Sequence, residues 1–176
     1  MTAPPVDRLA AARAELIAKH LRAAGVTLVA SLPDQWTGDL IRVLQDDAHM
    51  VHVRVAREDD GVGLCAGAAL GGRRAALVCQ NAGLLLSANA LAGYAHSHQL
   101  PFLVLCASRG GADDAYFYQA YKGRTTVQFL DALQLPYHVV ERAEQLSLIE
   151  DGYRQAVVWR TPVVLLLGRR VLSGEV

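Results

Sequence analysis

The chain has 176 residues, of which 52% are hydrophobic and 19% are charged, and its 17 basic residues balance its 17 acidic residues. This length suits one domain with a buried core, and such an apolar composition is typical of a sheet covered on both faces. A neutral chain lacks the positive field that binds nucleic acid or an anionic membrane. We therefore expect a small molecule or a protein as the binding partner.

Three cysteines, Cys65, Cys79 and Cys106, lie inside apolar segments. They lack the paired spacing of a zinc site or a disulfide framework, so we expect reduced residues of the core. The first residues contain no charged leader followed by an apolar run, and no apolar stretch reaches the roughly 20 residues that span a bilayer. A cytoplasmic protein without a membrane partner is the expectation.

Apolar segments of helical and extended character alternate along the chain after a proline-bearing lead-in over residues 1–6. In chain order we expect helix 7–24, strand 26–30, helix 36–45, strand 51–55, helix 59–70, strand 74–79, helix 84–96, strand 101–107, helix 125–133, strand 137–140, helix 143–158 and strand 162–167. This alternation predicts a single α/β domain over residues 1–176. Its expected architecture is a three-layer, open, mainly parallel six-stranded sheet with helices on both faces.

Ligands of such sheets bind beyond the carboxyl ends of the strands. That rule selects four segments, namely 32–34, 57–61, 80–85 and 108–122. The last of them is polar and aromatic without a clear period, and we interpret it as a lid or an interface segment.

Three acids, Glu58, Asp59 and Asp60, begin an expected helix. Stabilisation by the helix macrodipole is the simpler interpretation of this pattern, and a carboxylate that binds a cofactor is the alternative. The same helix is rich in glycine, and each internal glycine costs roughly 0.5–1 kcal/mol relative to alanine. Either tight packing on the sheet or the close approach of a cofactor or subunit would compensate this cost.

The run Gln80-Asn81-Ala82-Gly83 follows a strand, as a phosphate-binding loop would, but it matches neither GxGxxG nor a Walker loop. Turn formation is its simpler interpretation. His96 and His98 are two positions apart and cannot share one helical face, so a metal pair is not expected. No nucleophile motif is present.

Several of these motifs together resemble the pyrimidine-binding (Pyr) domain of thiamine diphosphate enzymes, in particular those of the sulfopyruvate and phosphonopyruvate decarboxylase type. The likeness is carried, in the same order, by the runs at 57–68, 80–84, 89–91, 100–101, 108–110, 123–125, 130–133 and 135–137. It extends over roughly residues 13–167, which makes it more specific than any single motif.

The resemblance implies that Glu58 hydrogen-bonds the aminopyrimidine ring of thiamine diphosphate and favours its imino tautomer, so that a 2-oxo acid is decarboxylated to an aldehyde and CO₂. Glu58 is then the catalytic residue. The cofactor contacts implied are Glu58, Gln80, Asn81, Ala82, Gly83, Leu84 and Leu85. The residues expected at the substrate end are Pro33, Asp34, Gln35, Trp36, Arg109 and Arg124.

In this family a second, PP domain holds the diphosphate and Mg²⁺ with a Gly-Asp-Gly run followed by paired asparagines, and this chain contains no such pattern. The resemblance therefore implies no metal ligand here and a PP-domain β subunit on a separate chain, with an α2β2 assembly as the expectation.

The chain departs from the family pattern in three places. Ala82 replaces a serine, while Leu85 and Leu86 replace a glycine and an asparagine and alter the shape and polarity of the pocket. Asp34 places an acid near the expected substrate. Two alternatives follow, a noncatalytic Pyr-like assembly or regulatory subunit whose pocket these leucines close, and the subunit of a carboligase that uses the same cofactor.

Overall fold

The structure is a computed structural model that describes residues 8–173, so the predicted lead-in lies outside the described residues. Six strands form near their predicted positions. They are β1 Leu28–Ser31, β2 Val51–Arg54, β3 Ala75–Gln80, β4 Leu103–Ala107, β5 Tyr137–Val140 and β6 Val163–Leu167.

The strands make one sheet in the order β2-β1-β3-β4-β6-β5, and every neighbouring pair is parallel. Strands β4 and β6 are buried along their whole length, which explains their uninterrupted apolar sequences, whereas the edge strand β2 is partly exposed. All six carboxyl ends therefore meet at one edge of the sheet, where the predicted ligand-binding segments lie.

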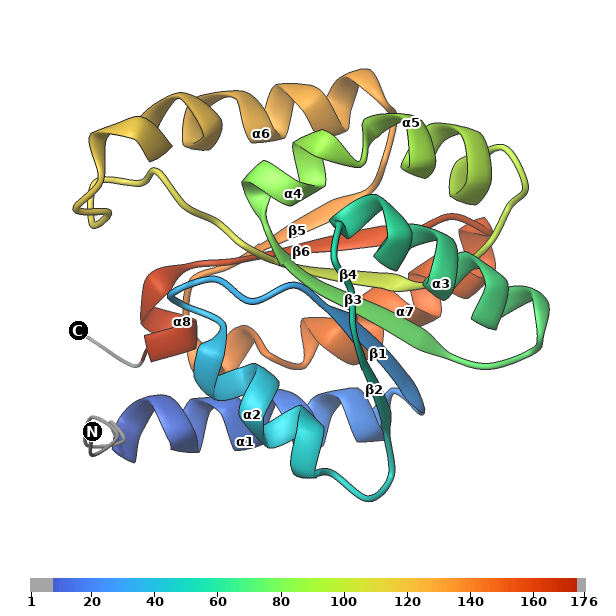
Figure 1. Cartoon of the computed structure of the whole chain (residues 1–176), viewed down its shortest axis with the longest axis horizontal. Helices are drawn as coiled ribbons and strands as arrows, with labels where there is room; N and C mark the ends of the chain where they lie inside the picture. Colours follow the sequence, from blue (N-terminus) through green and yellow to red (C-terminus); the bar gives the residue numbers. More distant parts are fainter. Residues whose placement is uncertain (1–7, 174–176) are drawn as a thin grey trace.

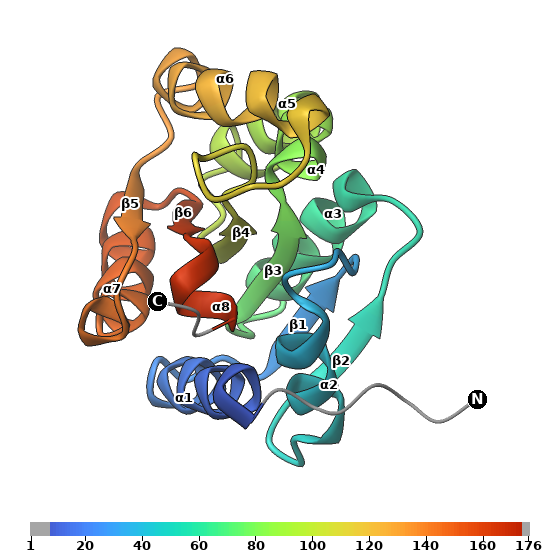
Figure 2. The same cartoon turned by 90° about the vertical axis from the view of Figure 1, so that its left-hand side faces the viewer.

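Helices cover both faces of the sheet (Figures 1 and 2). One layer contains α1 Arg8–Ala23, α2 Gly38–Asp46, α7 Leu148–Trp159 and α8 Arg169–Ser173. The other contains α3 Glu58–Leu70, α4 Asn81–Leu86, α5 Ala88–Ala90, the π-helical turn η1 Leu91–His96 and α6 Ala120–Ala132. Each layer packs its own apolar cluster against the sheet. The predicted three-layer α/β fold is thus confirmed.

Several helices differ from their predicted bounds. The helix expected over 84–96 begins at Asn81 and is broken at Ser87, whose hydroxyl donates a hydrogen bond to the Gly83 carbonyl oxygen at 2.8 Å and so competes with the regular backbone ladder. Helix α6 begins at Ala120 instead of 125, and the helix expected over 143–158 opens with the 3₁₀ turn η3 Ala143–Gln145. A further 3₁₀ turn, η2 Phe117–Gln119, and the short helix α8 are not predicted.

Glycines on two sides of α3 have different explanations. A Cβ atom added to Gly61 would lie 2.6 Å from the Leu77 Cδ1 atom in strand β3, so this glycine allows tight packing of helix on sheet. A Cβ added to Gly63 or Gly67 would meet nothing within 4 Å. The outward side of α3 is therefore thin and open, and packing within the chain does not explain these two glycines.

The three cysteines are free and buried, which confirms that they belong to the core. Burial raises the pKa of the Cys65 thiol to about 12, so this side chain stays neutral at physiological pH.

We expect opposite effects of two alanine substitutions in α3. Gly61→Ala should lower the free energy of unfolding by about 1–3 kcal/mol, because the added methyl group overpacks the contact with Leu77. Gly67→Ala should raise it by roughly 0.5–1 kcal/mol, because only the helix propensity changes. Urea unfolding followed by circular dichroism measures both. Equal destabilisation by the two substitutions would contradict the packing assigned to Gly61.

Candidate functional site

Glu58 begins helix α3 directly beyond the edge strand β2, and only 7% of the residue is exposed. Its carboxylate lies against Gly83 of helix α4, where a Cβ atom would be 2.1 Å from the Glu58 Oε1 atom. Only glycine at position 83 leaves room for Glu58 in this orientation. Among residues 8–173, none donates a hydrogen bond to this carboxylate. Its oxygen atoms thus remain available to a ligand.

Asn81 fixes the start of helix α4 beside Glu58. This residue is fully buried, and its Nδ2 atom donates hydrogen bonds to the Arg109 carbonyl oxygen at 2.9 Å and to the Thr126 hydroxyl oxygen at 3.2 Å. Its Oδ1 atom is buried without a partner in the described part of the chain. Sequence reasoning interpreted 80–83 as a turn, and this interpretation is wrong because the helix begins at Asn81, directly after the strand.

The remaining predicted cofactor contacts have different environments. Leu84 is buried in the apolar cluster, while Ala82 and Leu85 are half-buried. The neighbouring Leu86 is 53% exposed and lines a surface pocket together with Gly63 of α3. Leu86 therefore lies on the outer surface next to the open side of α3.

Arg109 forms a buried ion-pair cluster at the carboxyl ends of strands β1 and β4. Its Nε and Nη2 atoms donate to the two carboxylate oxygens of Asp114 at 2.7 and 3.0 Å, and its Nη1 atom donates to Asp34 Oδ2 at 3.0 Å. The side chains of all three residues are at most 4% exposed. Bidentate pairing of this kind is geometrically specific and fixes both partners.

Aromatic rings and backbone amides complete this cluster. The Arg109 guanidinium lies 4.2 Å from the centroid of the Trp36 ring and 5.7 Å from that of Tyr116, at cation–π distances. The other carboxylate oxygen of Asp34, Oδ1, accepts hydrogen bonds from the amides of Trp36 and Thr37 and from the Thr37 hydroxyl group. Asp34 is thus already paired within the chain and does not present a free carboxylate to a substrate.

The Arg109 cluster also shifts pKa values. Hydrogen bonds from Arg109 hold the pKa of Asp114 below its ordinary value. Burial opposes the charge of Arg109, but its hydrogen bonds to Asp114 and Asp34 outweigh this effect and raise the pKa of the guanidinium above its ordinary value. Arg109 and Asp114 are therefore charged at neutral pH, and with two carboxylates to one guanidinium the cluster has one excess formal negative charge.

The structure separates the other residues predicted at the substrate end. Pro33 and Gln35 are exposed in the turn before helix α2, and Arg124 is exposed on helix α6. Asp34, Trp36 and Arg109 are the members of that set that come into contact with one another. Asp114 is the partner that sequence reasoning missed, because nothing in its local sequence indicates a contact with Arg109.

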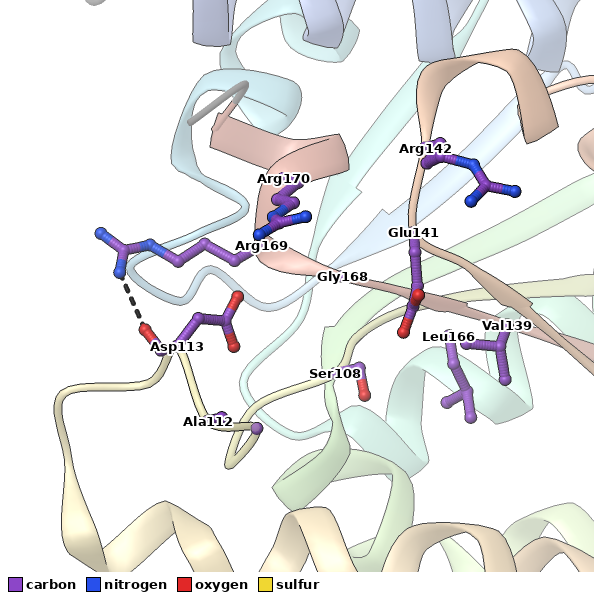
Figure 3. Close-up of a pocket in the computed structure, with 11 residues that line it drawn as sticks. Ser108, Ala112, Asp113, Val139, Glu141, Arg142, Leu166, Gly168, Arg169 and Arg170 are labelled. Atoms are coloured by element: carbon purple, nitrogen blue, oxygen red, sulfur yellow. Dashed lines mark hydrogen bonds between the residues drawn. The ribbon is translucent and has the colours of Figure 1, made fainter. Parts of the chain in front are cut away.

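A separate cavity of about 410 Å³ lies at the carboxyl ends of β4, β5 and β6 (Figure 3). Its polar lining comes from Ser108, Asp113, Glu141, Arg142, Arg169 and Arg170. Arg169 Nη1 donates a hydrogen bond to the Asp113 carbonyl oxygen at 2.9 Å. Ser108 and Asp113 belong to the predicted ligand-binding segment 108–122, but none of the residues predicted to contact the cofactor or the substrate lines this cavity, so it is distinct from the surroundings of Glu58.

Within residues 8–173 there is no group of three or more His, Cys, Asp or Glu side chains arranged to hold a metal ion. No helix in that range has the length and apolarity needed to cross a membrane.

Comparison with solved structures defines the class of fold. The chain superimposes with a TM-score of 0.72 and 17% identity on 2-oxoglutarate:ferredoxin oxidoreductase from Magnetococcus marinus, a structure with 2-oxoglutarate, coenzyme A and succinyl-CoA bound. The match covers 91% of this chain and 29% of that chain. The fold is that of a Pyr domain of thiamine diphosphate enzymes.

Sequence comparison then gives the family. The chain is 32% identical over 154 residues to sulfopyruvate decarboxylase subunit alpha of Methanococcus maripaludis, covering 87% of this chain and 92% of the relative. It is 28% identical over 149 residues to the same subunit of Methanocaldococcus jannaschii, covering 83% and 87%. Phosphonopyruvate decarboxylase of Streptomyces viridochromogenes is 28% identical over 165 residues, which are 92% of this chain and 41% of that protein. No family model matches.

The chain belongs to the family of sulfopyruvate decarboxylase α subunits. This result confirms the resemblance inferred from the motifs.

Loss of the Arg109 guanidinium should destabilise the fold strongly. Arg109→Met leaves the buried carboxylates of Asp34 and Asp114 without their cation, and breaking a buried pair in this way costs about 3–5 kcal/mol. The matched control Arg154→Met breaks an exposed pair with Asp151 and should cost at most about 1 kcal/mol. Urea unfolding at pH 7 measures both variants. Equal effects would contradict the role assigned to Arg109.

The difference in unfolding free energy between the wild type and Arg109→Met should depend on pH. Because the folded pKa of Asp114 is lowered, its stabilising contribution is present above the unfolded value of about 3.9 and is lost as the pH falls through the folded value. The difference between the wild type and Arg109→Met should therefore shrink as unfolding is measured at successively lower pH below about 4.

Proposed function

We propose that this chain, as a single Pyr domain over residues 1–176, is the α subunit of a thiamine diphosphate-dependent 2-oxo acid decarboxylase that releases CO₂ and an aldehyde. The observation that carries the proposal is the buried Glu58 carboxylate held against Gly83, in a chain of the sulfopyruvate decarboxylase α-subunit family.

The polar groups around Glu58 fit an aminopyrimidine ring. The Glu58 carboxylate receives no hydrogen bond from residues 8–173, and in helix α4, which contacts it through Gly83, the buried Asn81 Oδ1 atom has no partner in that range. An unpaired buried acceptor such as Asn81 Oδ1 is costly and is usually explained by a ligand or water. A nitrogen heterocycle with an exocyclic amino group offers donors that would satisfy such acceptors.

Residues of this chain would orient the cofactor and share one proton with it. Glu58 would form a hydrogen bond with a ring nitrogen, and the absence of a side chain at Gly83 leaves room for the carboxylate in this orientation. Leu84 packs in the apolar cluster beneath helix α4. Gln80, Asn81, Ala82 and Leu85 are the further contacts that we propose. When bound, thiamine diphosphate supplies the electron sink that decarboxylation of a 2-oxo acid requires.

A partner subunit would complete the active site. The relatives' designation as α subunits supports a partner chain, and this sequence contains no Gly-Asp-Gly run followed by paired asparagines. We therefore assign the diphosphate and Mg²⁺ to a PP-domain β subunit in an α2β2 assembly. The open side of α3 at Gly63 and Gly67, with the exposed Leu70 and Leu86, supports close approach of another chain there.

Glu58→Gln should abolish most of the decarboxylation in the complex reconstituted with the β subunit. Loss of a positioned proton-exchanging group lowers turnover by about 10²–10⁴-fold. Glu144→Gln, an exposed carboxylate on the opposite helical layer, is the control and should keep wild-type turnover. Release of CO₂ from a panel of 2-oxo acids gives the rate, and product analysis separates aldehydes from carboligation products. Full activity of Glu58→Gln would refute the assigned role.

Gly83→Ala tests the contact itself. The added methyl group would displace the Glu58 side chain while favouring helix α4 by up to roughly 1 kcal/mol. Because the methyl group would lie within 2.3 Å of three atoms of the buried Glu58 side chain, we expect a loss of thermal stability comparable with that of Gly61→Ala, together with at least tenfold weaker binding of thiamine diphosphate to the folded complex, measured by calorimetry. Unchanged binding would show that position 83 does not control the cofactor site, and no binding by the wild-type complex would favour a noncatalytic subunit.

A further inference from the structure

The segment that links β4 to α6 is fixed at both of its ends. At its start, the bidentate ion pair between Arg109 and Asp114 holds the segment in a tight loop. Gly110 has a φ of +87°, and a Cβ atom there would lie 2.2 Å from the Gln119 carbonyl oxygen, while a Cβ on Gly123 would lie 2.6 Å from the Gly110 carbonyl oxygen. The two backbones are thus in direct contact, and residues 119–123 have a defined position at the carboxyl edge of the sheet.

This contact places Lys122 close to the predicted cofactor contacts. Gln119 Nε2 donates to Gln80 Oε1 at 3.5 Å, and Lys122 Nζ donates to Gln119 Oε1 at 3.1 Å. The Gln119 amide therefore connects the end of strand β3 with the ammonium group. The same ammonium lies 5.7 Å from the centroid of the Tyr118 ring, which covers it on one side.

Lys122 differs from Arg109 and Arg57, the cations next to the predicted cofactor contacts, in that no carboxylate of residues 8–173 pairs with it. Arg109 is bound by two carboxylates and Arg57 is paired with Asp59. The half-buried Lys122 has an amide oxygen and an aromatic face as neighbours, and within the described residues no carboxylate lies within ion-pair distance of it. A partly desolvated ammonium with neutral partners is a suitable site for a small anion.

We propose that Lys122 binds the second anionic group of the substrate, which is the sulfonate, phosphonate or carboxylate at the end of the 2-oxo acid remote from its reacting carbonyl. This inference rests on the proposed function and names the residue that selects the substrate class. Gln119 positions the ammonium group. Arg109 cannot take this role in its observed state, because its cluster with Asp34 and Asp114 has an excess negative charge that repels an anion.

The test compares two substrates in the α–β complex. Lys122→Met should lower the ratio of kcat/KM for sulfopyruvate to kcat/KM for pyruvate, which lacks the second anion, by about 10–100-fold, as expected for loss of a hydrogen bond between charged groups. The effect should lie mainly in KM. Lys122→Arg keeps the charge and should show a smaller loss. Lys19→Met, which changes the chain's other lysine on the exposed side of helix α1, is the matched control and should leave the ratio unchanged.

Three results would overturn the inference while the proposed function stands. The first is a wild-type complex that decarboxylates pyruvate as well as sulfopyruvate. The second is an equal loss on both substrates in Lys122→Met. The third is weakened assembly of Lys122→Met with the β subunit in sedimentation analysis, which would assign the ammonium to the partner. A wild-type complex that decarboxylates no 2-oxo acid would instead refute the proposed function, and the inference with it.

Discussion

The buried Arg109 side chain is the constraint on which the carboxyl edge of the sheet depends. Its guanidinium joins the turn after β1 to the segment after β4 through Asp34 and Asp114, and its carbonyl oxygen accepts the hydrogen bond of Asn81 at the start of α4. One residue thus connects the loops of three neighbouring strands. The positions of Gly83 and of the Glu58 carboxylate against it follow from this arrangement, since α4 begins where Asn81 is held.

The fold could be predicted from the sequence because its signals are local. Uninterrupted apolar runs such as Leu103–Ala107 and Val163–Leu167 indicate buried parallel strands wherever they occur. The three acids at 58–60 are visible in the sequence as a helix start after a strand, but only the resemblance to the family distinguishes Glu58 from the other two. The motifs around it then indicated the family, which sequence comparison confirmed.

The parts that could not be predicted depend on contacts between distant residues. Asn81 resembles a turn former in sequence, yet its partners Arg109 and Thr126 are 28 and 45 positions away. Gly123 lies inside helix α6, before the predicted start at 125, and the close approach of the Gly110 backbone leaves no room for a side chain there. Arg109 was predicted to face the substrate, and its pairing with Asp114 becomes visible only when the segment after β4 is folded.

Strand β2, which precedes helix α3 and Glu58, lies at the margin of the sheet. Strand β2 pairs with β1 alone, and within residues 8–173 no further strand covers its other side (Figure 2). Helix α3, which follows β2, therefore lies at the margin of the domain, and its side at Gly63 and Gly67 is open. In the proposed complex a partner could approach at this margin without opening either core, so each protein could fold before the joint site is assembled.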